Sequence, residues 1–335
     1  MNRDLVPLLC CIYCGGGLTL DAAAESGGRV ESGTLRCEAC DGQWPIVGFI
    51  PRFVSPENYA GNFGLQWNRF RRTQLDSNSG TSISRRRFFE TTGWSDGDLR
   101  GRRVLDVGCG AGRFAEIALS TGARVIAVDY SSAVEACRDN LLHNDSLDVV
   151  QADVYHLPFP RASFDFVYCL GVLQHTPDPA RAFRSLCDQL APEGRISVDV
   201  YPRLPLLFLW PKYWLRPWTR RMETARLLAL VERFVPWLLP ISDAVAAVPV
   251  IGRKLRYAVP VMNHRLSLPE LSREQVREWA VLDTFDMLSP AYDQPQTEAT
   301  VREWLARADL HETEVLQRGF LIGRGRRGSL QSPHA

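Results

Sequence analysis

Short apolar runs alternate with amphipathic stretches through the middle of this 335-residue chain. Short runs rich in valine, isoleucine and phenylalanine are typical of strands that are buried on both faces, whereas apolar residues spaced three or four apart are typical of helices. The pattern predicts strands at 103–107, 124–128, 147–151, 164–169 and 194–200, and helices at 112–121, 131–142 and 178–190. Such alternation indicates a doubly wound α/β fold, in which helices cover both faces of a parallel sheet.

The alternation stops at residue 202 and resumes after residue 266. The intervening segment is rich in tryptophan, leucine and proline and predicts a helical insert. Beyond it we expect an ordered loop at 284–297, a helix at 297–307, and two last strands at 311–317 and 319–323. We predict six segments along the chain. They are an N-terminal module at 1–55, a helical lid or linker at 56–100, a sheet core at 101–201, a cap insert at 202–266, the C-terminal part of the sheet domain at 267–324 and a disordered tail at 325–335.

The composition is that of an ordinary globular protein, with 45% hydrophobic and 23% charged residues and a formal net charge of +1. A chain this close to neutrality lacks the overall basic charge of many nucleic-acid-binding proteins. Its N-terminus shows no secretory pattern, and no stretch provides the about twenty consecutive apolar residues of a membrane span. We therefore expect a cytoplasmic protein.

The insert 202–266 differs from the rest of the chain in charge, because it holds eleven lysines and arginines against three acidic residues. Basic segments rich in tryptophan and leucine are typical of amphipathic layers at a membrane surface. Prolines and charges interrupt the segment too often for a spanning helix. We expect a helical cap over the substrate pocket, and two hypotheses give its outer face a partner: peripheral contact with a membrane, or RNA.

Two closely spaced cysteine pairs, Cys11-x2-Cys14 and Cys37-x2-Cys40, lie in the N-terminal module. In a reducing compartment such pairs favour metal binding over disulfide bonds. Four thiolates complete the tetrahedral coordination of a structural zinc ion, so these residues are the candidate ligands. Two alternatives stay open, namely a pairing of Cys10 with Cys14 and four reduced cysteines without metal.

The most distinctive motif is VLDVGCGAGRFA, at residues 104–115, where the first predicted core strand ends in three glycines. Glycines permit a tight turn and let a ligand approach the bare backbone at the start of the following helix. The spacing is G-x-G-x-G, with Arg113 where the dinucleotide fingerprint has its third glycine. Asp106 precedes the loop, and a carboxylate there favours a cofactor that carries an ammonium group.

Acidic residues also follow the next two predicted strands. Asp129 ends the second strand, where a carboxylate can accept hydrogen bonds from both ribose hydroxyls. Asp153 follows the third strand and is positioned for an adenine amino group. Because ligands bind at the carboxyl ends of parallel strands, these acids and the glycine loop are expected to share one site.

These residues resemble the class I S-adenosylmethionine-dependent methyltransferases, and among them the type 11 group that includes the ubiquinone and menaquinone methyltransferases. The resemblance is strong over residues 100–200 and weaker over 297–324. It implies a Rossmann-like, seven-stranded sheet whose last strand is antiparallel, and S-adenosylmethionine as the cofactor. The cofactor-binding residues that it implies are Asp106, Gly108, Cys109, Gly110, Gly112, Asp129, Tyr130, Ser131, Asp153, Val154, Leu170 and Gly171.

The segment around the cysteine pairs resembles the small zinc ribbons of the Trm112-like type. Members of that group occur alone, as methyltransferase partners, or fused ahead of methyltransferase domains. The resemblance implies a structural zinc ion held by Cys11, Cys14, Cys37 and Cys40.

The predicted lid contains a second group of candidate residues. In methyltransferases of this kind the lead-in to the first strand often covers the cofactor, which makes Gln66 and Trp67 candidates for that contact. Alternatively, Phe63, Trp67 and Phe70 simply form the apolar stripe of a helix.

Methyl transfer from a sulfonium is an in-line displacement, so a methyltransferase mainly has to align the acceptor and exclude water. A base is needed only where the acceptor loses a proton. His175, after the fourth predicted strand, is the candidate base, although it can instead cap the following turn or pack under the cofactor. Asp286 and Tyr292, in the predicted loop, are candidates for orienting the acceptor or for forming turns.

Three functions are compatible with these features. The first is methyl transfer to an oxygen or nitrogen of a small-molecule, sugar or lipid-linked acceptor. The second is methylation of rRNA or tRNA with the ribbon as a substrate module, but the basic charge lies in the insert rather than in the ribbon, which argues against nucleic acid as the partner. The third is a non-catalytic, partner-binding role, against which the complete set of cofactor residues argues. The sequence predicts neither the acceptor nor the oligomeric state.

Overall fold

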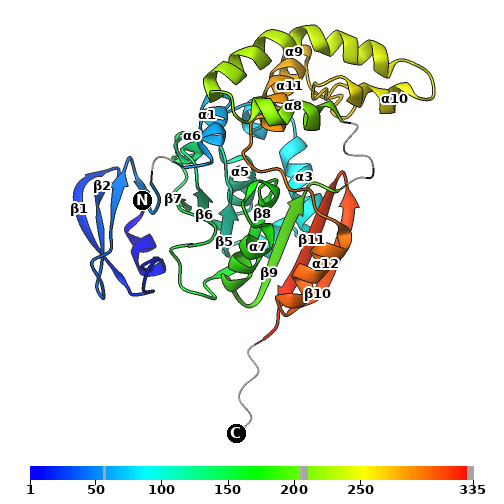
Figure 1. Ribbon diagram of the computed structural model, residues 1–335. Helices are drawn as coiled ribbons and strands as arrows, with labels where there is room; N and C mark the ends of the chain where they lie inside the picture. Colours follow the sequence, from blue (N-terminus) through cyan, green and yellow to red (C-terminus); the bar gives the residue numbers. More distant parts are fainter. Residues whose placement is uncertain (56–57, 204, 206–209, 330–335) are drawn as a thin grey trace.

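The computed structural model describes residues 1–55, 58–203, 205 and 210–329 (Figure 1). A small four-stranded sheet lies beside a larger body built on a seven-stranded sheet, and helices cover one end of that body. Parts of three predicted segments lie outside the described residues: 56–57 of the lid, 204 and 206–209 of the insert, and 330–335 of the tail.

The N-terminal module is an antiparallel sheet. Its elements are η1 (Arg3–Leu8), β1 (Leu18–Ser26), β2 (Arg29–Cys37), β3 (Gln43–Val47) and β4 (Ile50–Pro51). The strands pair in chain order, and their inner face buries Val30, Leu35 and Trp44. One cysteine pair precedes β1 and the other begins at the end of β2, so the fold brings both pairs to one end of the module.

The larger sheet confirms the predicted fold class. Its strands are β5 (Arg103–Val107), β6 (Arg124–Asp129), β7 (Leu147–Gln151), β8 (Phe164–Leu170), β9 (Leu190–Val200), β10 (Leu310–Arg318) and β11 (Phe320–Arg327). Among the described residues their order is β10-β11-β9-β8-β5-β6-β7, and β11 runs antiparallel to both of its neighbours. The remaining pairs, from β9 to β7, are parallel. The predicted tail starts too early, because Gly325 and Arg326 pair with β9 and extend the last strand to Arg327.

Helices cover the sheet on both faces. They are α5 (Arg113–Ser120), α6 (Ala133–Leu141), α7 (Pro179–Asp188) and α12 (Glu298–Arg307). Side chains alternate along the strands, so Val104 packs with α5 and α6 on one face while Leu105 packs with α7 and α12 on the other. Both residues are fully buried, which explains why these strands read as continuous apolar runs.

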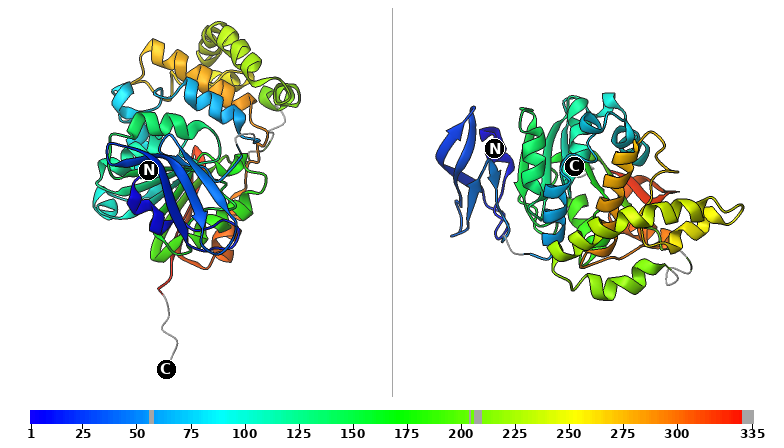
Figure 2. Two further views of the ribbon diagram at one scale, coloured as in Figure 1. Left: turned by 90° about the vertical axis from the view of Figure 1, so that its left-hand side faces the viewer. Right: turned by 90° about the horizontal axis from the view of Figure 1, so that it is seen from above.

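The N-terminal module extends the larger sheet at its β7 edge. Arg52 forms an isolated parallel bridge with Gln151, the last residue of β7, and the Phe53 amide donates to the Gln151 carbonyl at 2.8 Å. Asn2 adds an amide hydrogen bond of 2.7 Å to the Asp148 carboxylate. Both views of Figure 2 show the module standing against this side of the body.

Two groups of helices form the covering end of the molecule. The lead-in helices are α1 (Gly61–Arg69), α2 (Asp76–Ser79), α3 (Ile83–Thr92) and α4 (Asp96–Leu99), of which α4 lies away from the covering end, at the amino end of β5, where Asp98 pairs with Arg195. The later group is α8 (Pro211–Thr219), α9 (Thr224–Ala246), α10 (Gly252–Leu255), η4 (Arg256–Ala258) and α11 (Arg273–Leu288). Leu227, Val231 and Val235 of α9 pack with Phe285 of α11 in one apolar cluster that also includes residues of α1. No helix in the described part of the chain is both long and apolar enough to cross a bilayer.

The expectation of a loop from residue 284 is wrong over its first part. Helix α11 begins at a capping box, in which Ser272 and Gln275 satisfy each other's backbone amides, and it continues to Leu288. The buried residues Leu282, Phe285 and Leu288 follow one another at helical spacing. Asp286 therefore projects from a helix, and the loop starts only after it.

Candidate cofactor and acceptor site

The glycine loop connects β5 to α5 and is packed closely on two sides. Gly108 has a φ of +82°, and a Cβ there would lie 2.3 Å from a methyl carbon of Val172. Gly110 has a φ of +52°, and a Cβ there would lie 3.1 Å from the Trp67 ring. Only glycine fits these positions without strain. Helix α1 therefore lies directly over the loop, as the lid hypothesis for Trp67 expects.

The loop lines a cavity of about 690 Å³ at the carboxyl ends of β5, β6, β8 and β9. Helices α1, α3, α8 and α11 supply the other walls. Eight of the predicted cofactor residues line this cavity, namely Gly108, Cys109, Gly110, Asp129, Tyr130, Val154, Leu170 and Gly171.

The other four predicted cofactor residues are not among those that line the cavity. Gly112 ends the loop against Cys137 and Leu141, and Ser131 donates hydrogen bonds to Asp129. One Asp153 oxygen is engaged by the Tyr155 amide at 2.9 Å. Asp106 lies on β5, one residue before the strand's end.

The Asp129 carboxylate is held in place by the loop that it supports. One oxygen accepts from the Gly110 amide at 3.0 Å, and the other accepts from the Ser131 amide at 2.8 Å and hydroxyl at 2.7 Å. Burial raises the pKa of Asp129, and these hydrogen bonds oppose the rise. The carboxylate is therefore fixed in orientation at the edge of the cavity.

Asp106 is only 2% exposed, and among the described residues nothing donates a hydrogen bond to its Oδ2 atom. Burial raises its pKa to about 8; the Tyr168 hydroxyl opposes the rise and the charge of Asp129 adds to it. A buried carboxylate in this situation needs a cation nearby. An ammonium group beside the glycine loop supplies one, so these residues fit the methionine end of S-adenosylmethionine.

We expect Asp106→Asn to stabilise the ligand-free protein at alkaline pH. The folded protein holds the Asp106 carboxyl at a pKa of about 8, above its value in an unfolded chain, so its ionisation costs folding free energy as the pH rises from about 4 to about 8. Thermal unfolding followed by circular dichroism should show a higher midpoint for the variant at about pH 9 and a much smaller difference between the two proteins at about pH 5.

The same substitution should weaken the affinity for S-adenosylhomocysteine at least about tenfold, because a hydrogen bond to a charged group contributes about 1.5–3 kcal/mol. Calorimetric titration measures this loss. A variant that is no more stable than the parent at alkaline pH would show that the buried Asp106 carboxylate does not cost folding free energy. A variant that binds the ligand as well as the parent would show that Asp106 does not contribute to binding.

His175 is buried at the end of η2 (Leu173–His175), directly after β8. Its Nδ1 atom lies 3.0 Å from the Tyr292 carbonyl oxygen. Because a carbonyl can only accept, Nδ1 carries the proton and Nε2 presents a lone pair. Nε2 is buried, has no partner among the described residues, and belongs to a side chain that lines the cavity. Nε2 is therefore oriented to accept a hydrogen bond from a molecule in the cavity.

The other two predicted catalytic residues are placed differently from each other. The Asp286 side chain reaches the cavity and accepts hydrogen bonds from Gln66 at 3.4 Å and from the Tyr201 hydroxyl at 3.2 Å. Burial raises the pKa of Asp286. Tyr292 contacts His175 through its backbone carbonyl. Its ring packs edge-on against Tyr59, which lines the cavity, but Tyr292 itself does not line it.

Sequence reasoning missed a buried ion pair beside these residues. Lys212 of α8 lies 3.0 Å from Asp293, and its ammonium group stands 5.2 Å from the centre of the Tyr201 ring. The Lys212 and Asp293 side chains are 11% and 3% exposed. The pair links the insert to the loop after α11, whose Tyr292 carbonyl contacts His175.

Two further charged residues that line the cavity, Arg87 and Arg113, were also missed. Arg87 pairs with the fully buried Asp199 at 3.0 Å and lies over the Phe320 ring at 4.2 Å. Arg113 donates to Gln74 at 2.7 Å, and burial lowers its pKa to about 9.

His264 also lines the cavity, with Nε2 2.6 Å from the Asp283 carboxylate. Nothing in the sequence marks these residues, because their partners lie far away along the chain.

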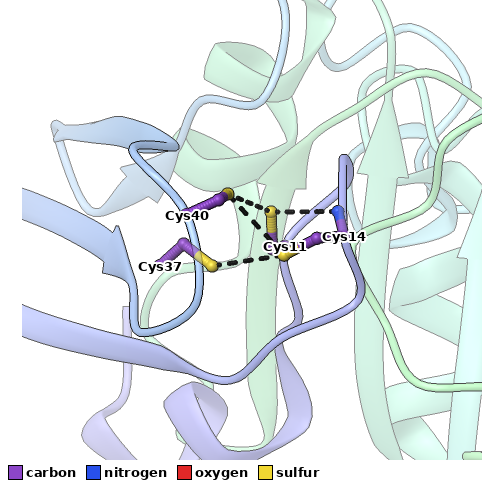
Figure 3. A group of neighbouring side chains, drawn as sticks. All are labelled: Cys11, Cys14, Cys37 and Cys40. Atoms are coloured by element: carbon purple, nitrogen blue, oxygen red, sulfur yellow. Dashed lines mark hydrogen bonds between the residues drawn. The ribbon is translucent and has the colours of Figure 1, made fainter.

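The four cysteines of the two pairs form one cluster (Figure 3). Their sulfur atoms all lie within 4.8 Å of one another, with Cys11 to Cys40 and Cys14 to Cys37 both at 3.5 Å. A tetrahedral zinc site with Zn–S bonds of about 2.3 Å has sulfur separations of about 3.8 Å, so the cluster fits that ion. Cys10 is outside the cluster, and its backbone amide instead donates to the Pro158 carbonyl.

Comparison with known proteins agrees with this geometry. Residues 105–198 match a family model described as a methyltransferase domain. The ubiquinone biosynthesis O-methyltransferase of Xanthomonas oryzae pv. oryzae is 36% identical over 114 residues, which cover 33% of this chain and 48% of the relative. An uncharacterised protein of Synechococcus sp. is 28% identical over 215 residues, covering 61% and 46%. The chain thus spans about half the length of the curated relatives it matches.

Among solved structures, a chain of the complex between the Haloferax volcanii Trm112 methyltransferase activator and a methyltransferase has 14% identity and a TM-score of 0.46, covering 82% of this chain and 99% of that chain.

The glycine loop, the strand order with its antiparallel β11, and the family match define the sheet domain as a class I S-adenosylmethionine-dependent methyltransferase domain. Within that class it is similar in sequence to the ubiquinone O-methyltransferases. The four-cysteine cluster on an antiparallel sheet fits a zinc ribbon ahead of it.

Proposed function

We propose that this protein transfers the methyl group of S-adenosylmethionine to an oxygen or nitrogen atom of a small-molecule, sugar or lipid-linked acceptor. The observation that carries the proposal is His175, whose Nε2 atom is buried at the cavity without a partner in the described structure. A base so placed suits an acceptor that loses a proton on methylation. The O-methyltransferase names of several relatives also favour oxygen.

In this proposal each part of the site would bind a different part of the cofactor. Asp129 would accept hydrogen bonds from the ribose hydroxyls, and Val154 and Leu170 would line the adenine side. Asp106, buried behind the glycine loop, would supply the negative charge that favours the ammonium group. S-adenosylmethionine supplies an activated methyl group on sulfur. His175 takes the acceptor proton on Nε2 as the new bond forms, and the Tyr292 carbonyl keeps the imidazole in the tautomer that can do so.

The acceptor side of the cavity favours a molecule with a flat or apolar body. Phe63, Trp210 and Tyr257 line the cavity, and Trp210 stacks on Tyr257 with ring centres 5.3 Å apart. Tyr201 and Asp286 supply polar contacts within the same cavity. Such a surface suits an aromatic or lipid-like acceptor that carries one polar group.

We also propose that Cys11, Cys14, Cys37 and Cys40 hold one structural zinc ion. Four protein ligands leave no open coordination position, so the ion would stabilise the ribbon and take no part in methyl transfer.

A transfer assay tests the proposed function. Radiolabelled S-adenosylmethionine is incubated with the protein and a panel of phenols, amino sugars and prenylated hydroquinones, and label transfer is measured. Labelling of one class supports the proposal and identifies the acceptor chemistry. Labelling of ribosomal or transfer RNA alone would overturn it in favour of RNA methylation. Cofactor binding without labelling of any of these would favour the partner-binding role.

With an acceptor in hand, we expect His175→Ala to lower kcat about 10²- to 10⁴-fold, the range typical of a lost general base. The affinity for S-adenosylhomocysteine should stay within about twofold, because the histidine faces the acceptor. His143→Ala is the matched control, since that side chain is exposed and lies outside the cavity lining. A His175 variant with full kcat would exclude the histidine as base.

A further inference from the structure

Helix α9 (Thr224–Ala246) has two apolar faces, of which the protein covers one. Leu227, Val231 and Val235 are buried against α1 and α11. Beside this buried face Phe234, Trp237 and Ile241, spaced three and four residues apart, are 51%, 76% and 52% exposed. The apolar sector of α9 is therefore wider than the part that the protein covers, and large exposed apolar side chains in a row mark a surface that binds a second partner.

The exposed apolar surface continues beyond the end of the helix. Val248 is 44% exposed, and Val250 and Ile251, in the turn before α10, are 99% and 52% exposed. Figure 1 shows α9 along the outer edge of the molecule, ending at a corner remote from the ribbon. We call this surface the outer face; it consists of Phe234, Trp237, Ile241, Val248, Val250 and Ile251.

Positive charge accompanies the outer face. Among the described residues, no carboxylate pairs with the exposed side chains of Arg226, Arg233 and Lys254. Two of the three acidic residues of the insert are already engaged, Glu232 by Arg69 and Asp243 by Arg265. The free charge on this part of the molecule is therefore cationic, and an anionic partner complements it.

The outer face is continuous along the chain with the wall of the acceptor cavity. Tyr257 follows α10 closely, is 45% exposed, and stacks on Trp210 with the ring planes inclined by only 7°. Both rings line the cavity. One segment thus carries the exposed apolar surface and an aromatic wall of the pocket.

We propose that the outer face docks on the surface of an anionic phospholipid bilayer, and that the acceptor is a bilayer-borne molecule that enters the cavity past Trp210 and Tyr257. This inference rests on the proposed function, whose acceptor class it narrows to a lipid-linked or lipid-soluble molecule. Tryptophan with arginine and lysine is the combination that binds at the headgroup level, and no described helix is able to span the membrane.

A second copy of the chain is a poorer occupant of the outer face. A symmetric dimer through this face would bring two cationic inserts together, each with eleven basic and three acidic residues. Like charges at an interface oppose association. Lipid headgroups supply the opposite charge.

Co-sedimentation with vesicles tests the inference. The protein is mixed with vesicles of phosphatidylcholine alone or with phosphatidylglycerol. The variant carries Phe234→Glu, Trp237→Glu and Ile241→Glu, and the matched control carries Val47→Glu, at an apolar residue of the ribbon that is 54% exposed. We expect binding to the anionic vesicles only, weakened by salt, reduced at least about tenfold in the triple variant and unchanged in the control.

Binding of S-adenosylhomocysteine, measured by calorimetry on the same samples, shows that each variant is folded and separates the two proposals. Intact ligand binding without vesicle binding by the parent protein overturns the membrane inference and leaves the methyltransferase proposal standing. Equal vesicle binding by parent and triple variant also overturns it. So does sedimentation velocity that shows a dimer of the parent protein and a monomer of the triple variant, because the outer face would then bind a second copy.

Discussion

Asp129→Ala is expected to weaken the binding of S-adenosylhomocysteine about a hundredfold or more, because the substitution removes a charged acceptor for two hydroxyl groups and each such hydrogen bond contributes about 1.5–3 kcal/mol. The structure adds a second loss. The same carboxylate holds the Gly110 amide at 3.0 Å and both donors of Ser131, so its removal also frees the glycine loop. Calorimetric titration of the purified protein measures the effect.

Two further variants make the result specific. Asp129→Asn keeps the side-chain shape and one acceptor oxygen, so its affinity should lie between those of the parent and the alanine variant. Asp21→Ala removes a carboxylate that is 72% exposed, on the ribbon, and should bind like the parent. Full binding by Asp129→Ala would mean that the ribose lies elsewhere and would remove the main support for the cofactor site.

The purified protein is expected to contain one zinc ion per chain, and Cys37→Ser combined with Cys40→Ser should abolish that content. Structural zinc contributes about 10–16 kcal/mol of apparent binding free energy in small metal-dependent domains, far more than the small apolar core of the ribbon supplies. The double variant should therefore lose the ribbon fold, which mass spectrometry for zinc and hydrogen exchange across β1 to β4 together detect.

Cys10→Ser is the matched control for this prediction. Cys10 directly precedes the ligand candidate Cys11 in the chain but is not part of the cysteine cluster. Its backbone amide instead donates a hydrogen bond to the Pro158 carbonyl of the sheet domain. The Cys10→Ser variant should contain one zinc ion per chain and have a folded ribbon. Zinc loss in the Cys10 variant would favour the alternative pairing with Cys14, and a zinc-free parent with a folded ribbon would show that the four thiols hold the module without metal.

The sheet could be predicted well because its strands are buried on both faces. Val104, Leu105 and Val107 have no polar alternation, and the glycines that follow mark the strand end sharply. Helix α11 was harder, since its first turns carry charged residues and only Val276 marks the buried face there before Trp279. A propensity-based pattern cannot show that this helix faces two partners, α1 and α9.

The candidate site could be predicted where its residues directly follow or end a predicted strand. Asp106, the glycines and Asp129 stand at strand ends, so their positions follow from the sheet. The role of Tyr292 was not predictable from its side chain, because it contributes a backbone carbonyl to His175. The Lys212–Asp293 pair joins residues from either side of α11, and only the tertiary fold brings them to 3.0 Å.

The contact between Arg52 and Gln151 has a consequence for the fate of the protein in a cell. Strand β7 is the outermost parallel strand, and the unpaired backbone of such a strand can recruit other chains into aggregates. The N-terminal module shields that backbone at Gln151, and we expect the fold of the module to depend on the proposed zinc ion. Zinc starvation should therefore lower the yield of non-aggregated protein, because chains associate at the exposed edge of β7. This loss does not depend on the supply of S-adenosylmethionine.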